Sequence, residues 1–120
     1  MGKIIVIGGG AAGMMAAAAA AEQGVKVIVY EKNEKLGKKL FITGKGRCNL
    51  TNHCDMETLF GNVVTNGKFL YSAFYGFDNQ AAMDWFEKAG CRLKTERGGR
   101  VFPVSDHSSD VIGALSGQLK

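Results

Sequence analysis

The sequence predicts an α/β fold built on a parallel sheet with helices packed on both faces, giving three layers. Three observations carry this prediction: a β-branched run at residues 3–7, a glycine cluster at 8–13 that opens an alanine-rich stretch, and a second β-branched run at 25–30. Apolar runs of this kind are typical of parallel strands buried on both faces. Hydrophobic residues make up 46% of the chain and charged residues 22%, which is the composition of an ordinary globular domain.

The elements of this unit follow one another as a strand, a turn, a helix and a second strand. The run at 3–7 is expected to be the first strand, and residues 8–13 match the pattern Gly-x-Gly-x-x-Gly. A helix is expected over 14–23, because the segment contains six consecutive alanines and Gly24 is placed to end it. The second strand is expected over 25–30, which completes a βαβ unit.

Four positions of the βαβ unit have the properties that a dinucleotide site requires. Gly8 permits a tight turn out of the strand, Gly10 lets a pyrophosphate approach the backbone, and Gly13 lets the helix pack closely on the strand. The phosphates would then meet the positive end of the helix dipole. Glu31 ends the second strand, where a carboxylate accepts hydrogen bonds from ribose hydroxyls and repels a 2′-phosphate. The pattern therefore predicts a Rossmann-type site for FAD or NAD, and it does not separate the two.

A basic segment follows the βαβ unit. Residues 32–47 contain six lysines and arginines and one acid, Glu34, although the net charge of the whole chain is only +4. A bound phosphate and a simply solvated loop both account for this charge. Nucleic acid is a weaker prediction, because Phe41 is the one aromatic side chain in the segment and nucleic-acid surfaces interleave basic with aromatic residues. We therefore expect a small-molecule substrate and do not favour a nucleic-acid partner.

Two later segments carry a more specific signal. Residues 36–52 read LGKKLFITGKGRCNLTN, and residues 99–105 read GRVFPVS. Both resemble the bacterial flavoproteins described as aminoacetone-oxidase-like or NAD(P)/FAD-dependent oxidoreductases, whose relatives include proteins linked to bile-acid reduction. The resemblance covers essentially the whole chain, and residues 43–52 are its most specific part, because long identical motifs seldom recur by chance.

The resemblance implies a Rossmann-like FAD/NAD(P)-binding domain that is incomplete in this chain. Residues 1–120 would be its N-terminal part and would divide into the βαβ unit 1–31, a cofactor loop 36–54, and helices with a short hairpin over 55–120. A second, mostly β domain would lie beyond this stretch. The isolated chain is therefore expected to be inactive and to bind FAD weakly.

The same resemblance assigns cofactor contacts. It places Gly10, Ala12 and Gly13 at the pyrophosphate, Glu31 and Lys32 at the adenosine ribose, and Lys39, Arg47, Cys48 and Asn49 on the side that runs from the phosphates to the flavin. The planar fork of Arg47 suits a phosphate or a flavin carbonyl, and Asn49 can both donate and accept hydrogen bonds at the ring edge. No catalytic acid or base is identifiable in the sequence.

The function that follows is that of an FAD-dependent oxidoreductase. A hydride would be transferred at the flavin, and NADH or NADPH is a candidate reductant. Three alternatives stay open: an NAD-binding dehydrogenase, a non-enzymatic dinucleotide sensor, and a flavin-dependent RNA-modifying protein, since the last class shares the glycine pattern and the chain is basic. Neither the substrate nor the oligomeric state is indicated.

The cysteines bear on a fourth alternative, a dithiol flavoenzyme. Cys48, Cys54 and Cys91 are odd in number and match neither a disulfide framework nor a zinc site, which predicts a reducing, cytoplasmic setting and no metal. Dithiol flavoenzymes carry a C-x4-C pair, whereas five residues separate Cys48 from Cys54. A reduced thiol, buried or facing the cofactor, is therefore expected at Cys48. Surface or capping roles are expected for His53 and His107.

The N-terminal run at 4–21 carries no charge and mimics a membrane span or a signal peptide. Glycines interrupt it, however, and no aromatic or basic anchors follow it. No membrane partner is expected.

The rest of the chain is predicted to be structural. Apolar residues at helical spacing predict two amphipathic helices over 70–77 and 82–89, with their apolar stripes in the core. Short strands are expected over 91–95 and 100–102, joined as a hairpin. A last helix, with Val111, Ile112, Leu115 and Leu119 on one side, is expected to run to the end of the chain.

Overall fold

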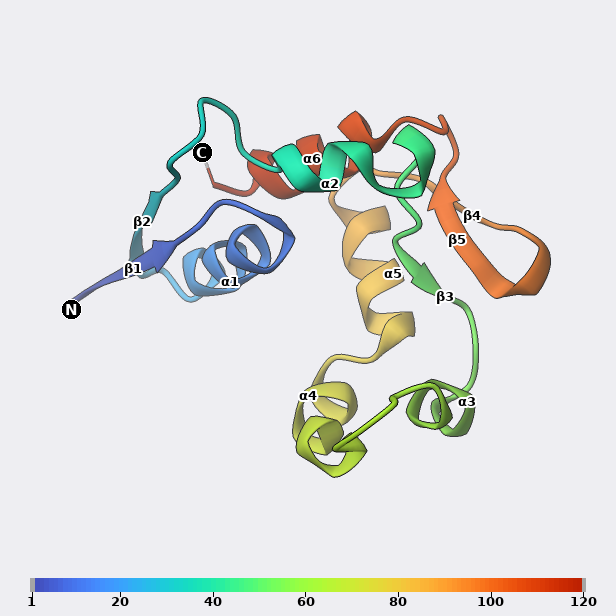
Figure 1. Ribbon diagram of the computed structural model, residues 1–120. Helices are drawn as coiled ribbons and strands as arrows, with labels where there is room; N and C mark the ends of the chain where they lie inside the picture. The colour runs from blue at the N-terminus through green and yellow to red at the C-terminus, as the bar shows by residue number, and fades with distance from the viewer. Residues whose placement is uncertain (1, 120) are drawn as a thin grey trace.

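A parallel pair of strands and a helix begin the chain in the computed structural model, which describes residues 2–119. The strands are β1 (Lys3–Ile7), β2 (Lys26–Tyr30), β3 (Thr51–Asn52), β4 (Leu93–Thr95) and β5 (Arg100–Pro103). The helices are α1 (Ala11–Glu22), α2 (Lys38–Ile42), α3 (Met56–Gly61), α4 (Tyr71–Gly76), α5 (Asn79–Lys88) and α6 (Ser108–Gly117). Short 3₁₀ turns occur at η1 (Thr43–Gly46), η2 (Gly67–Leu70) and η3 (Arg97–Gly99). Figure 1 shows β1, β2 and α1 at one end of the molecule, the sheet of β3, β4 and β5 at the other, and α2, α5 and α6 between them.

The first unit is a strand–helix–strand crossover. β1 and β2 pair in parallel, so that Ile5 lies opposite Ile28 and Ile7 lies opposite Tyr30. The helix that connects them, α1, packs beside the pair (Figure 1). The βαβ unit predicted from the sequence is therefore confirmed, and with it the α/β class.

α1 begins three residues earlier than the helix expected over 14–23, directly after its N-cap residue Gly10. Gly24 has φ +78°, and its N–H donates to the Ala21 carbonyl at 3.0 Å, so the prediction that this glycine ends the helix is confirmed. The helix contains 12 residues. In the described part of the chain, no helix combines the length and the apolar character needed to cross a bilayer.

The prediction that the first strand is buried on both faces is wrong for the described residues. Val6 lies on the face toward α1, where its Cγ1 is 3.5 Å from the position that a Cβ on Gly13 would take. The opposite face carries Ile5, Ile7 and Tyr30, which are 54%, 78% and 57% exposed. Side chains alternate between the two faces of a strand. Within residues 2–119, α1 covers only part of one face, where Ile4 is still 42% exposed, and the other face stays open.

The core lies where α1, α5 and α6 meet. Its buried side chains include Met14 from α1, Phe86 from α5, and Val111 and Leu115 from α6. These positions confirm the apolar stripes predicted for the helix over 82–89 and for the last helix. α6 ends at Gly117, however, so the prediction that it runs to the end of the chain is wrong.

The second sheet has the order β3-β5-β4, and both pairings are antiparallel. β4 and β5 form the predicted hairpin, in which the Glu96 N–H donates to the Arg100 carbonyl at 2.7 Å. β3 was not predicted, because two residues are too few for an alternation pattern. Its pairing with β5 brings the chain that follows η1 alongside the hairpin.

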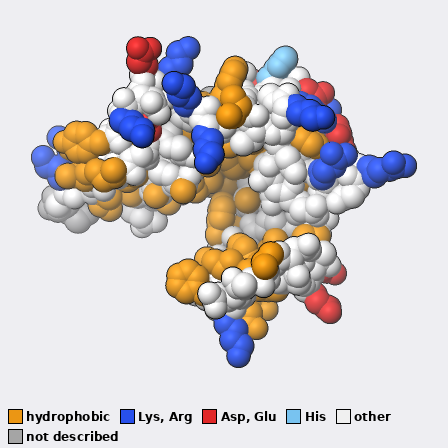
Figure 2. Space-filling model, viewed as in Figure 1, with side chains coloured by type: hydrophobic (Ala, Val, Ile, Leu, Met, Phe, Trp, Pro, Cys, Tyr) orange, Lys and Arg blue, Asp and Glu red, His pale blue; other side chains and the backbone are white. Residues whose placement is uncertain are grey.

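The segment that contains α3 and α4 projects from the rest of the molecule (Figure 1). Phe60 of α3 packs edge-on against Tyr71 and Phe74 of α4, with ring centroids 4.9 and 5.3 Å apart. α4 has no buried residue, so the prediction that the stripe over 70–77 packs into the core is wrong. The stripe meets a neighbouring helix that the sequence did not indicate, and Figure 2 shows hydrophobic side chains on the surface of this segment.

Candidate functional site

The turn between β1 and α1 has the conformation that the glycine pattern requires. Gly8 has φ +97°, a value that L side chains rarely adopt, and its N–H donates to the Tyr30 carbonyl of β2 at 2.7 Å. A Cβ on Gly13 would overlap the Gly8 carbonyl oxygen. The helix can therefore approach the turn this closely only with glycine at both positions.

The N-terminus of α1 is open to an anion. No side chain caps the helix at Gly10, and no acidic residue lies in its first turn. A Cβ on Gly10 would have no atom within 4 Å, and Ala11 and Ala12 are exposed. The first N–H groups of any helix lack partners within the helix and carry its positive dipole end. Together these features leave backbone donors and free space at one point.

Glu31 joins the end of β2 to the glycine turn. Its Oε1 accepts a hydrogen bond from the Gly9 N–H, and its Oε2 accepts one from the Asn33 N–H, each at 2.7 Å. These bonds, first from Asn33 and then from Gly9, lower the pKa of the Glu31 carboxyl, so the side chain is charged at neutral pH. Each carboxylate oxygen keeps a second lone pair that a ribose hydroxyl could reach. The bond to Gly9 was not anticipated from the sequence, because it spans 22 positions.

The chain after Glu31 returns to the same turn. The Gly37 N–H donates to the Gly9 carbonyl at 2.7 Å, and α2 starts at the next residue. Lys32 and Lys39 are exposed on either side of this return, with no ion pair among the described residues. α2 has five residues, which at the usual rise span about 8 Å, so the loop that follows begins close to the glycine turn.

A groove of about 790 Å³ lies beside this return segment. Its wall combines the basic side chains of Lys32, Lys35 and Lys38 with the apolar side chains of Phe41, Ile42 and Ile112. Three of the six basic residues in the segment recognised from the sequence therefore line a groove that also includes residues of α2 and α6.

The loop over residues 43–52 has an unusual backbone. Gly44 and Gly46 have φ +57° and +86°, and the non-glycine residues Lys45 and Cys48 have φ +57° and +60°. Left-handed conformations at non-glycine residues are costly and persist where surrounding contacts determine them. A Cβ on Gly44 would lie 2.7 Å from the Asn49 backbone nitrogen, so the loop is also folded tightly on itself.

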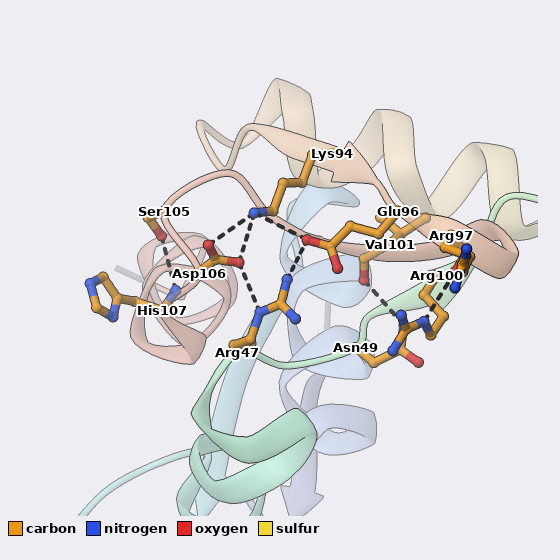
Figure 3. Close-up of polar contacts among 10 residues, drawn as sticks. All are labelled: Arg47, Asn49, Lys94, Glu96, Arg97, Arg100, Val101, Ser105, Asp106 and His107. Atoms are coloured by element: carbon orange, nitrogen blue, oxygen red, sulfur yellow. Dashed lines mark hydrogen bonds and ion pairs between the residues drawn. The ribbon is translucent and has the colours of Figure 1, made fainter.

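Arg47 is the best-connected side chain of this loop (Figure 3). Its Nε donates to Asp106 Oδ1 at 2.9 Å and its Nη2 donates to Glu96 Oε2 at 2.5 Å. The guanidinium also lies over the ring of Phe102, 3.8 Å from the centroid. Lys94 contacts the same two carboxylates, at 2.8 Å for Asp106 and 3.3 Å for Glu96. We call these four charged residues the Arg47 network.

The Arg47 network changes the protonation equilibria of its members. Hydrogen bonds from Lys94 and then from Arg47 lower the pKa of Asp106, and those from Arg47 and then Lys94 lower the pKa of Glu96. Sequence reasoning missed Lys94, Glu96 and Asp106, because Glu96 and Asp106 lie 49 and 59 positions from Arg47 and no local pattern links them.

Asn49 and Cys48 lie next to Arg47 but face different surroundings. The Asn49 amide donates to the Thr51 and Val101 carbonyls at 3.0 and 3.2 Å, although the residue is exposed. Cys48 is 2% exposed and belongs to the core, and burial raises the pKa of its thiol. The sequence predicted a thiol at Cys48 that is either buried or faces the cofactor. The structure places it in the core.

All three cysteines are free thiols. Cys91 is buried like Cys48, and burial followed by the nearby Asp110 raises its pKa to about 11. Cys54 is half-buried, and its carbonyl accepts a hydrogen bond from Asn79 at 2.8 Å. Among residues 2–119, no three His, Cys, Asp or Glu side chains cluster closely enough to hold a metal ion.

Comparisons with known proteins agree with this geometry. Residues 2–120 match the family described as HI0933-like protein Rossmann domain. The chain is also 36% identical over 96 residues to a 3-dehydro-bile acid delta(4,6)-reductase from Clostridium scindens, a match that covers 79% of this chain and 22% of that protein. The chain therefore spans about a fifth of the length of this relative. With its strand, glycine turn, helix and terminal acid in the order that a Rossmann fold needs, the chain belongs to the HI0933-like family.

Proposed function

We propose that this chain is the N-terminal part of the cofactor-binding domain of a longer FAD-dependent oxidoreductase. The observation that carries the proposal is the meeting of three features at one turn: the uncapped N-terminus of α1, the open space at Gly10, and the Glu31 carboxylate bonded to Gly9. Backbone donors at a helix N-terminus suit a pyrophosphate, and a carboxylate at the end of β2 suits the ribose hydroxyls.

The residues present fit an ADP-containing cofactor. A Cβ is absent where phosphate would approach, at Gly10, and the space there is free of protein atoms within 4 Å. The charged Glu31 favours FAD or NAD over NADP, because a 2′-phosphate would face a carboxylate. The choice of FAD rests on the loop over residues 43–52 and its resemblance to aminoacetone-oxidase-like flavoproteins.

The oxidoreductase class is supported by the family and by the Clostridium scindens relative, whose name describes a reductase. Because the aligned region covers 22% of that relative, we propose the reaction class and leave the substrate as a small molecule. NADH or NADPH is proposed as the reductant. The free thiols of the three cysteines support a cytoplasmic location.

When bound, FAD would supply two-electron redox chemistry at its isoalloxazine ring. This chain would contribute binding and orientation. The α1 N-terminus, with Gly10, Ala12 and Gly13, would hold the pyrophosphate, and Glu31 would accept hydrogen bonds from the ribose. Lys32 and Lys39, exposed beside the turn, would add positive charge near the phosphates. The loop with Asn49 would lie toward the flavin.

The identity of the nucleotide tests this proposal. The full-length protein is purified, its absorbance is recorded between the near-ultraviolet and the visible, and the nucleotide released by denaturation is identified by mass. We expect the flavin spectrum and one FAD per chain. Release of NAD without flavin would instead indicate a dehydrogenase, and a protein that neither retains nor takes up either nucleotide would contradict a dinucleotide site.

A further inference from the structure

The Arg47 guanidinium carries a positive charge that nearby carboxylates already offset. Its Nε donates to the Asp106 carboxylate at 2.9 Å, and its Nη2 donates to the Glu96 carboxylate at 2.5 Å. Lys94 forms ion pairs with the same two acids. The Arg47 network therefore contains two cations and two anions, and its charges sum to zero. A phosphate that approached Arg47 would meet these carboxylates as well, and the repulsion would offset the attraction.

The Arg47 network also joins two segments of strained backbone. On one side it holds the loop in which Lys45 and Cys48 have φ +57° and +60°. On the other side Asp106 itself has φ +63°, in the turn between β5 and α6. Figure 3 shows the Arg47 and Asp106 side chains reaching toward each other from these two segments, with Lys94 and Glu96 beside them. Strained conformations persist where the surrounding contacts determine them, and the network supplies such contacts to both segments.

We propose that Arg47 is a positioning residue and not a cofactor ligand. Through Asp106 and Glu96 it fastens the loop over residues 43–52 to the β4–β5 hairpin and to the turn before α6. The stack on Phe102 adds a contact with the hairpin. The loop is thereby kept in the one conformation that presents Asn49 and its neighbours to the flavin. This inference rests on the proposed function, because it assigns Arg47 a role in FAD binding that is exerted through other residues.

The two roles make opposite predictions for Asp106. If Arg47 were a ligand, removal of the Asp106 charge would free the guanidinium and leave FAD binding unchanged or tighter. If Arg47 positions the loop, the same change would loosen the loop and weaken binding. Asp106→Asn is suited to this test, because asparagine tolerates a left-handed backbone as well as aspartate does. It removes the charge and replaces one of the two carboxylate oxygens, which accept from Arg47 and from Lys94, with an NH2 donor.

The experiment uses the full-length protein, stripped of FAD, with the variants Arg47→Met, Asp106→Asn and the double variant. FAD affinity is measured by titration with flavin fluorescence, and the melting temperature of each apoprotein is measured separately. Arg100→Met is the matched control. Arg100 also lies over the Phe102 ring, with its guanidinium carbon at 5.7 Å, but its Nε donates to the Arg97 carbonyl and it has no carboxylate partner among the described residues.

We expect each single variant to weaken FAD binding about tenfold, with the double variant no weaker than the singles because both remove the same coupled unit. The visible spectrum of the remaining bound flavin is expected to shift in both, while Arg100→Met keeps the wild-type affinity and spectrum. Undiminished affinity in Asp106→Asn beside a loss in Arg47→Met would identify Arg47 as a ligand and overturn the proposal.

Four further outcomes also overturn it. Losses that multiply to about a hundredfold in the double variant would show independent roles. A lower melting temperature with unchanged affinity and spectrum would show that the network is structural alone. A wild-type protein that binds no FAD would refute the proposed function itself, and the positioning role with it, whereas a normal wild type with unaffected variants refutes the positioning role alone.

Discussion

Glu31 accepts a hydrogen bond from the backbone N–H of Gly9 at 2.7 Å, so the acid at the end of β2 braces the glycine turn that it faces. Its removal would take away the acceptor for the ribose and loosen the turn at the same time. We expect Glu31→Ala to weaken FAD binding by about tenfold or more, the scale of one lost charge-assisted hydrogen bond. Glu34→Gln is the control, because Glu34 is exposed and has no ion pair among the described residues. If both variants bind FAD with equal affinity, Glu31 does not contribute to the FAD site.

Substitutions at Gly10 and Gly13 are expected to have different effects, one on FAD binding and the other on stability. Gly10→Ala adds a Cβ into open space at φ −83°, so the apoprotein should keep its stability, while the methyl group obstructs the pyrophosphate and weakens FAD binding about tenfold. Gly13→Ala adds a Cβ that overlaps the Gly8 carbonyl and should destabilise the apoprotein itself. Thermal melts and FAD titrations of the full-length variants check both expectations.

Gly113→Ala is the control for these glycine variants. Gly113 lies within α6, where a Cβ meets no atom within 4 Å, so alanine should stabilise the protein by about 0.5–1 kcal/mol and leave FAD affinity unchanged. The assignment of Gly10 to the pyrophosphate fails if its alanine variant binds FAD as tightly as this control does.

The Arg47 network predicts a dependence of stability on acid. Because the folded-state pKa values of Glu96 and Asp106 lie below their ordinary values, their contribution is complete above about pH 4.3, the ordinary value of a glutamate, and is lost as the pH falls through the lowered folded values. Melting temperatures recorded from pH 6 downward should therefore fall more steeply below about pH 4 in the wild type than in a Glu96→Gln/Asp106→Asn double variant. Parallel profiles would show that the network does not couple to folding.

The cysteines predict an order of reactivity. Cys48 and Cys91 are buried and their thiol pKa values are raised, so few thiolates form near pH 8, whereas Cys54 is half-buried and should be alkylated first. Mass mapping after timed treatment with iodoacetamide checks this order, with the denatured protein as the reference. Cys54→Ser should keep full flavin reduction, because the proposed function uses no cysteine pair, whereas the dithiol alternative requires one. Loss of flavin reduction in this variant would restore that alternative.

The open face of the β1–β2 pair predicts that residues 1–120 alone bind FAD less well than the longer protein. Ile5, Ile7 and Tyr30 are more than half exposed on this face, and apolar surface of this kind favours association or loosened packing. We expect the isolated chain to bind a hydrophobic dye and to carry little flavin after purification. A soluble, monomeric chain that holds one FAD would contradict this expectation.

Short-range sequence patterns were sufficient to predict the βαβ unit. Strand propensity, the glycine pattern, the alanine run and Gly24 act within a few residues of each other, so each leaves a readable signal. The hairpin and the apolar stripes around Phe86 and Val111 were predicted for the same reason. The stripe over 70–77 was misplaced, since helical spacing shows that one face is apolar but not which surface covers it.

The sequence by itself determined the Rossmann-type start, and from it we predicted which residues would meet a dinucleotide. Tertiary structure decided how those residues are held. The bond from Gly9 to Glu31, the return of Gly37 to the same turn, and the pairing of Arg47 with Asp106 join parts of the chain that lie 22 to 59 positions apart. Such contacts depend on the path of the backbone between them, and neither spacing nor composition encodes that path locally.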